Sequence, residues 1–374
     1  MASDPFKEDK KELLAKDPDT FVNAVAHLLL QRRPELTAEV KKHEARLVKV
    51  ALTASPQPKK RIAAVKALQA LKSAELPKLS ALLTERSTEL VQTAAIALGG
   101  TVTSPDGVAA LIKKYETAGD WSPQHDAIKA LRYFDDPRVV PTFLKALGHE
   151  QNAVRVMALQ GLAMRKAPEG VPHFLAGLGS SSPGVLITSA RALYELDTPE
   201  ARKAVSDAKA YARALKLAKD EIQGRFAVRA LPWFRAKSVE ADLLALALKS
   251  QDAEVVGAAT EGLVLRGSQS ALGPLAKKAV TSDDPGYYGG TLVQLLHGLA
   301  FKFDPDVKAV GAMLTALGAA KSGVLEEIAG QSEQQRYRLD RAEGAELEHL
   351  VAWRKALARA KKNKAGIVAL LEEP

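Results

Sequence analysis

The side chains best suited to chemistry are scattered along this chain. It has seven histidines, His27, His43, His125, His149, His173, His297 and His349. The nearest two, His27 and His43, are sixteen positions apart, so no local pattern has the short spacing of metal ligands. The chain has no cysteine, which excludes disulfides, thiolate metal sites and a cysteine nucleophile. We therefore predict no metal site and no cofactor.

Acidic pairs and glycines indicate no reaction centre either. Asp135-Asp136 and Asp283-Asp284 each stand directly before a proline. Capping of a helix N-terminus explains such pairs better than acid–base catalysis does. The chain has no Gly-rich phosphate loop and no nucleophile elbow. The sequence thus favours a non-catalytic protein, and we assign no catalytic residue.

The composition is typical of closely packed helices. Of the 374 residues, 47% are hydrophobic but only 5% aromatic, and Ala and Leu lose little conformational freedom in helices. The charged N-terminus lacks an apolar segment, and no stretch approaches the roughly 18 apolar residues of a membrane span. We expect a soluble cytoplasmic protein without membrane insertion. The net charge of +9 permits contact with nucleic acid, acidic protein or an anionic surface, but ordinary solubilising charge is the alternative.

A small residue followed by leucine recurs at intervals of 30 to 38 residues. These anchors are Ala67-Leu68, Ala97-Leu98, Ala130-Leu131, Gly161-Leu162, Ala192-Leu193, Ala230-Leu231, Gly262-Leu263 and Gly298-Leu299. After several of them a second apolar run begins with an early proline, at Pro77, Pro141, Pro172 and Pro274. Two helical segments per period predict an all-α, right-handed, curved α-solenoid. In such a fold, stacked repeats complete each other's hydrophobic core.

One repeat resembles the HEAT-repeat family, in the short form found in phycocyanobilin-lyase-type arrays. Val154-Arg155-x-x-Ala158-x-x-Gly161-Leu162, followed by Val171-Pro172-x-Phe174-Leu175, matches that pattern best. The resemblance covers about eight repeats over residues 58–318. The family's arginine is kept only at Arg61 and Arg155, and Gln124 takes its place in another repeat. The resemblance implies the fold, but such arrays serve many functions.

The period divides the chain into three parts. We predict an N-terminal helical cap over 1–57, the repeat array over 58–318, and a C-terminal helical cap over 319–374. The C-terminal cap ends in a basic tail from Arg354 to Lys364, which has six cations and no acid. Within the array, Ala201 to Asp220 is predicted to form one long basic helix.

The position just before each anchor suggests a binding surface. Its occupants are Lys66, Ile96, Lys129, Gln160, Arg191, Arg229, Glu261 and His297. Since the small anchor residue faces inward, its predecessor, about 100° round the helix, is expected to face out. In HEAT-like arrays the second helix lines the concave surface. We therefore predict a basic concave stripe, made by Lys66, Lys129, Arg132, Arg155, Arg191, Arg225 and Arg229. The alternative is a solvated helix face.

Two functions fit this stripe, and a third rests on repeat similarity alone. The leading hypothesis is a protein-interaction scaffold or adaptor that binds a partner along its concave surface. The runner-up is a nucleic-acid-binding protein, for example a DNA-repair enzyme of the HEAT-like glycosylase type. Trp121, Asp126, Trp233 and Arg235 are the only candidates for a lesion-binding cleft, but they match no family motif, and the tryptophans are more typical of packing. A bilin-lyase-like enzyme is third. The sequence predicts neither the partner nor the oligomeric state.

Overall fold

The structure, a computed structural model, describes residues 5–53, 58–99, 105–320, 323–327 and 344–358. Every regular element in these ranges is a helix, which confirms the predicted all-α class. None of these helices is both long enough and apolar enough to cross a membrane. The chain divides into unit 1 (Met1–Val171) and unit 2 (Pro172–Pro374), and this division falls inside the predicted array.

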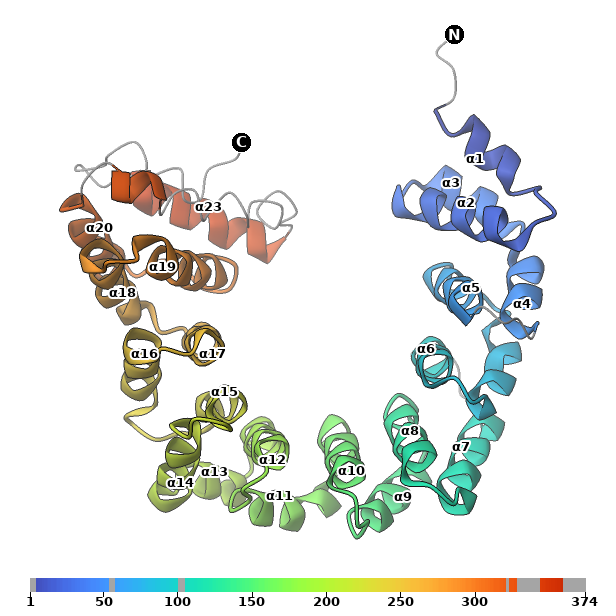
Figure 1. Ribbon diagram of the computed structural model, residues 1–374, viewed down its shortest axis with the longest axis horizontal. Helices are drawn as coiled ribbons and strands as arrows, with labels where there is room; N and C mark the ends of the chain where they lie inside the picture. Colours follow the sequence, from blue (N-terminus) through green and yellow to red (C-terminus); the bar gives the residue numbers. More distant parts are fainter. Residues whose placement is uncertain (1–4, 54–57, 100–104, 321–322, 328–343, 359–374) are drawn as a thin grey trace. The chain divides into compact units, whose positions relative to one another are not determined.

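Unit 1 is a stack of helix pairs preceded by further helices at its N-terminal end (Figure 1). Its helices are α1 (Lys7–Glu12), α2 (Pro18–Leu30), α3 (Pro34–Lys41), α4 (Glu44–Leu52), α5 (Pro58–Ala70), η1 (Leu76–Thr84), α6 (Thr88–Gly99), α7 (Pro105–Thr117), α8 (Trp121–Leu131), α9 (Val139–Ala146), α10 (Asn152–Met164) and η2 (Pro168–Gly170). The second helices of the pairs, here called B helices, are α5, α6, α8 and α10, and they pack side by side in one layer. The first helices, here called A helices, are α4, η1, α7 and α9, and they form the other layer.

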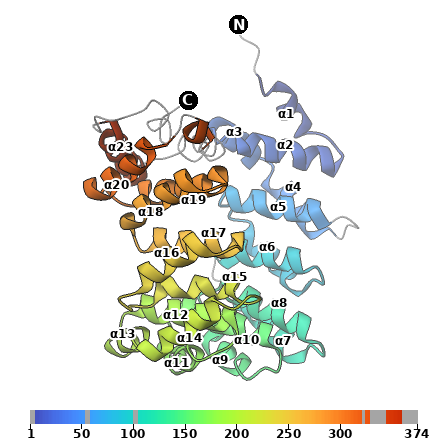
Figure 2. The ribbon, with the colours of Figure 1, turned by 60° about the vertical axis from the view of Figure 1, so that its left-hand side comes forward.

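Unit 2 repeats this two-layer arrangement (Figure 2). Its helices are α11 (Val171–Gly177, whose first residue ends unit 1), α12 (Pro183–Leu196), α13 (Pro199–Val205), α14 (Ala208–Ala218), α15 (Gly224–Ala227), η3 (Val228–Trp233), α16 (Val239–Lys249), α17 (Ala253–Leu265), η4 (Gln269–Ala271), α18 (Leu272–Thr281), α19 (Pro285–Ala300), α20 (Val307–Gly318) and α23 (Ala345–Ala358). The B helices are α12, η3 with α15, α17 and α19. The A layer contains α11, α13, α14, α16, α18 and α20.

The small-Leu anchors explain why these helices stack. Every predicted anchor lies in a B helix, and each anchor leucine is completely buried. The small residue lets a neighbour approach closely. A Cβ atom on Gly161 would lie 2.6 Å from the ring of Phe143, and one on Gly298 would lie 2.6 Å from the Cγ2 atom of Val264. The α-solenoid architecture predicted from the period is therefore confirmed within each unit.

Of the two acidic pairs predicted to cap a helix, Asp283-Asp284 does so and Asp135-Asp136 makes a different contact. The side chain of Asp284 accepts a hydrogen bond from the backbone N–H of Tyr287 at 3.0 Å, and Pro285 occupies the first turn of α19. This confirms the predicted N-cap. Asp136 instead accepts from the backbone N–H of Arg138 at 2.9 Å, in the turn before α9.

The prediction of one long helix from Ala201 to Asp220 is wrong. The chain forms two helices, α13 and α14, separated at Ser206 and Asp207. The side chain of Asp207 accepts from the backbone N–H of Ala210 at 2.7 Å and so starts a new helix. The carbonyl of Val205 accepts from the backbone N–H of Arg235 at 2.8 Å instead of continuing the first helix.

Helix α23 covers the last helices of unit 2. It packs on α19 and α20, and its buried side chains are Leu350, Trp353 and Leu357. The indole Nε1–H of Trp353 donates to the carbonyl of Phe303 at 2.6 Å. Trp353 is therefore a core residue, which confirms the prediction that this tryptophan serves packing. The predicted basic tail continues beyond Ala358, and that part lies outside the described residues.

Candidate partner-binding surface

The predicted outward position on each B helix is open to solvent in most repeats. In unit 1, Lys66 and Ile96 are exposed, and Lys129 and Gln160 are partly exposed. In unit 2, Arg191, Arg229 and Glu261 are exposed. The anchors beside these positions point into the core, so the phase of each helix turns their predecessors outward. The exposed side of the B helices is called the B face of each unit below.

His297 is the exception, because only 3% of its surface is exposed. The prediction that this position faces out is wrong in α19. Helix α23 packs on α19, and Glu346 at its start lies near His297 around a shared cleft. A helix from outside the repeat pattern thus covers a position that is open in the earlier repeats.

Arg132 lies on unit 1 but is only partly available to a partner. Its Nη1 atom donates to the Oε1 atom of Gln160 at 2.7 Å and lies 3.1 Å from the Sδ atom of Met157. Burial lowers the pKa of Arg132 below its ordinary value. The guanidinium therefore fastens α8 to α10 and presents little charge to solvent, unlike the exposed Lys66.

Arg155 turns away from the other residues of the predicted stripe. Its Nη1 atom donates to the carbonyls of His149 and Glu150, at 2.7 Å and 2.6 Å. These carbonyls belong to the turn before α10, so the side chain ties this helix to the preceding loop. Lys66 and Lys129 are left as the accessible cations of the predicted stripe in unit 1.

Unit 2 brings together a cluster of arginines and aromatic rings that the sequence did not predict as a group. The guanidinium carbon of Arg191 lies 5.3 Å from the ring centroid of Trp233, and that of Arg235 lies 4.9 Å from the ring centroid of Tyr194. The rings of Tyr194 and Trp233 meet edge to face at 5.7 Å. We call these four residues the Arg–aromatic cluster. Cation–π contacts hold its cations in place while Arg191 stays exposed.

Two acidic residues orient the arginines of this cluster. Glu195 accepts from the Nε atom of Arg191 at 2.7 Å, one turn along α12. Asp197 binds both Arg202, with 2.6 Å between Nη2 and Oδ2, and Arg235. Asp197 has a φ of 52°, and this left-handed conformation ends α12. Hydrogen bonds from Arg202, with further attraction from Arg235, hold the pKa of Asp197 below its ordinary value.

The ionisation of Asp197 should therefore be measurable as a depressed pKa. Since the folded-state pKa is lowered, the ion pairs are fully present above the unfolded pKa of about 4 and are lost as the pH falls through the folded value. Carboxyl NMR titration is expected to place the Asp197 pKa below that of exposed aspartates. In Arg202→Gln the pKa should return toward about 4. An unchanged pKa in this variant would contradict the assignment.

Apolar side chains are also exposed on the B face, and they were not predicted from the sequence. Met164 and Leu265 are 54% and 47% exposed, and each lies four residues after an outward position. Residues four apart lie on the same face of an α-helix. The positions four residues after the outward ones are therefore expected to be exposed as well. Phe226, beside Arg225, adds a ring that is 51% exposed.

The four candidates for a lesion-binding cleft are divided between the two units, and only Trp233 and Arg235 share a cluster, the Arg–aromatic cluster of unit 2. Trp121 is 47% exposed and meets His125 edge to face, at 6.3 Å. Asp126 is buried and accepts from the hydroxyl of Thr88 at 2.6 Å. Trp233 and Arg235 belong to unit 2. Among the described residues, no group of three or more His, Cys, Asp or Glu side chains could hold a metal ion.

Comparison with known proteins supports the repeat assignment. The family model for HEAT repeats matches residues 108–193 and 140–212. A search of curated proteins found no match. The chain is similar to human deoxyhypusine hydroxylase in complex with glycerol, at 14% identity and a TM-score of 0.32, covering 69% of this chain and 96% of that one.

Two larger solved structures are also similar. Kap95p, from a study of its binding to RanGDP, matches at 13% identity and a TM-score of 0.39, over 97% of this chain and 52% of that chain. The karyopherin Kap121p, bound to the extreme C-terminus of the protein phosphatase Cdc14p, matches at 11% identity and a TM-score of 0.39, over 93% and 44%. The chain thus spans about half the length of these two proteins.

Proposed function

Since the chain belongs to the HEAT-repeat proteins, we propose that it is a non-catalytic scaffold that binds another protein along its B face. Stacked helical repeats present extended surfaces that suit such a role. The observation that carries the proposal is the Arg–aromatic cluster beside exposed Arg229 and Leu265. Tryptophan, tyrosine and arginine are the side chains most enriched in binding hot spots. A cytoplasmic location is part of the same proposal.

The mixture of side chains on the B face favours a protein partner over duplex DNA. A duplex is recognised largely by cations along its phosphates. Here the outward positions include Ile96, Gln160 and Glu261 as well as lysine and arginine. Arg191 is already paired with Glu195. A partner that offers both acidic and apolar side chains would satisfy this face better than a uniform row of phosphates would.

The partner should be lost when the B face of unit 2 is altered. We expect Arg191→Glu with Arg229→Glu and Leu265→Ser to lower partner recovery from native lysate at least about tenfold, because charge and apolar contact are both removed. The measurement is quantitative mass spectrometry after affinity capture. Lys203→Glu with Lys277→Glu is the matched control, since both lysines are exposed on A helices. The scaffold proposal would be contradicted if the unaltered protein recovered no stoichiometric partner, or if both variants recovered the partner equally.

Nucleic acid is the second candidate, and the Arg–aromatic cluster is the observation that favours it. Bases of a single strand stack on aromatic rings flanked by arginine. Labelled single-stranded and duplex oligonucleotides in a gel-shift assay at low salt test this function. Binding should weaken steeply with salt, and reversal of Lys129, Arg191 and Arg229 to Glu should abolish it. The absence of a shift at low salt would exclude this function.

A further inference from the structure

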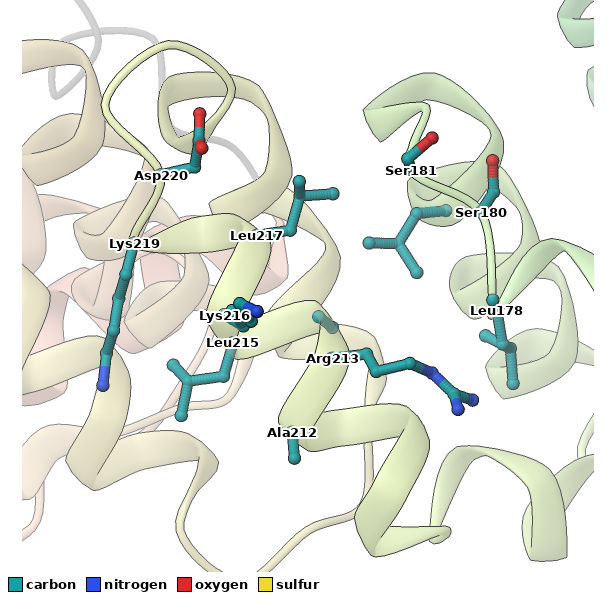
Figure 3. Close-up of a pocket in the computed structure, with 13 residues that line it drawn as sticks. Leu178, Ser180, Ser181, Ala212, Arg213, Leu215, Lys216, Leu217, Lys219 and Asp220 are labelled. Carbon is teal, nitrogen blue, oxygen red and sulfur yellow. The ribbon is translucent and has the colours of Figure 1, made fainter.

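A groove on the A layer of unit 2 offers a second binding surface. It has a volume of about 760 Å³ and lies between α14 and the turn that joins α11 to α12 (Figure 3). The turn contributes Gly179, Ser180 and Ser181, and α14 contributes Arg213, Lys216 and Leu217. The break at Asp207 creates this groove wall, because it lets α14 run as a separate helix from α13.

The floor of the groove is apolar. Leu178 and Leu186 line it and are 5% and 1% exposed. Leu217 is partly exposed and extends toward the turn from the opposite wall. A groove with this floor can bury the apolar side chain of a ligand, which a row of surface cations alone cannot do.

The rim of the groove along α14 is basic, while Asp220, which lines the groove just after this helix, accepts hydrogen bonds from the backbone N–H groups of Ile222 and Gln223. Helix α14 carries Lys209, Arg213 and Lys216 on its exposed side and has no acidic residue. These positions are separated by four and three residues, so they form one stripe along the helix. Figure 3 shows Arg213 extending toward Leu178 and Ser180, while Lys219 points away from them.

These α14 cations have no acidic partner within the described part of the chain. Other arginines of unit 2 are paired, as Arg191 is with Glu195 and Arg202 is with Asp197. Arg213 and Lys216 are therefore available to pair with an external anion, at the edge of a floor made of leucines.

We propose that this groove binds a short acidic and apolar segment of another protein. Carboxylates of the segment pair with Arg213 and Lys216, and its apolar side chains cover Leu178 and Leu217. A nucleic-acid backbone has no apolar group to place on this floor. A membrane surface is disfavoured because the apolar side of α14, with Tyr211 and Ala214, is buried in the fold. The groove lies on the A layer, so the inference is independent of the B face.

Fluorescence anisotropy on the full chain tests this proposal. The probe is a labelled peptide of about twelve residues in which pairs of Glu alternate with pairs of Leu, a pattern that presents both groups to a groove. The peptide should bind saturably, and Arg213→Glu with Lys216→Glu should weaken it at least about tenfold. Leu217→Ala should weaken it several-fold, without a change in its salt dependence. Circular dichroism verifies that each variant is folded.

Controls separate this site from general attraction to a basic protein. Lys203→Glu with Lys277→Glu removes the same charge elsewhere on the A layer and should leave the affinity within about twofold, since neither lysine lines the groove and exposed charges are screened. Arg191→Glu with Arg229→Glu on the B face should also leave it unchanged. A peptide with Ser in place of Leu, or a single-stranded oligonucleotide of equal charge, should bind at least about tenfold more weakly. Equal binding of either probe, or no effect of the α14 reversal, would overturn the proposal.

Discussion

Gly161→Val is expected to destabilise unit 1 by about 3 kcal/mol, because it forces a branched side chain into a filled contact. The Cβ atom would lie 2.6 Å from both the Cε2 and Cζ atoms of Phe143, which is completely buried in α9. The ring is also covered by the guanidinium of Arg165, 5.2 Å from its centroid, and therefore has little room to move. Urea denaturation and hydrogen exchange of peptides from α8 to α10 measure the effect.

Gly257 provides a control, because its replacement is expected to raise the stability instead of lowering it. Gly257 lies inside α17, and a Cβ atom there would meet nothing within 4 Å. Gly257→Ala should therefore stabilise unit 2 by up to about 1 kcal/mol, because alanine is the better helix former. Phe143→Leu should recover part of the stability lost in Gly161→Val if the ring is the obstacle. A harmless Gly161→Val would show that close approach of α9 and α10 is not what the anchor provides.

Arg165→Ala is expected to cost unit 1 about 2–4 kcal/mol, because several backbone carbonyls lose a charged donor at once. The guanidinium donates to the carbonyl of Leu131 at 3.2 Å, to that of Arg132 at 3.3 Å, and also to that of Phe134. The carbonyls of Leu131 and Arg132 lie at the C-terminal end of α8, where a positive charge is favourable, and that of Phe134 lies just after it. Thermal and urea unfolding report the change.

Conservative replacement distinguishes this capping role from simple charge. Arg165→Lys should restore less than half of the lost stability, since one ammonium group cannot reach carbonyls spread along a helix end. Lys113→Ala is the control, because Lys113 is exposed on α7, and it should change stability by less than about 0.5 kcal/mol. Full recovery with lysine would mean that geometry at this helix end is unimportant.

The position of the B helix that carries the family's arginine shows what the motif can predict. The sequence indicated that its arginine is kept only at Arg61 and Arg155. Arg61 donates to the carbonyl of Ala51 at 2.8 Å and pairs with Glu85 at 2.7 Å. Gln124, at the matching position of α8, donates to the carbonyls of Tyr115 and Ala118 at 3.3 Å and 3.2 Å. Both residues fasten a B helix to the end of the preceding A helix, so a contact persists where the residue type does not.

Other features of the surface could not be read from one helix at a time. Arg132 and Arg155 belonged to the predicted basic stripe, but each is engaged by groups outside its own helix. Arg191 packs on Trp233 and Arg235 packs on Tyr194, although 42 and 41 positions separate the members of these pairs along the sequence. Nothing in their local spacing distinguishes a cation that packs on a ring from one that points into water.

The sequence by itself determined the repeat. A small residue before leucine, recurring at about thirty residues, sets which side of each B helix is buried, because helical periodicity fixes the phase of every neighbour. It also determined the N-cap at Asp284, which depends on contacts within a few residues. Only the tertiary structure decided which outward positions stay open. His297 is covered by α23, and the groove beside Arg213 exists because α14 is a separate helix. Burial and pairing depend on side chains from other repeats, and no local spacing encodes those neighbours.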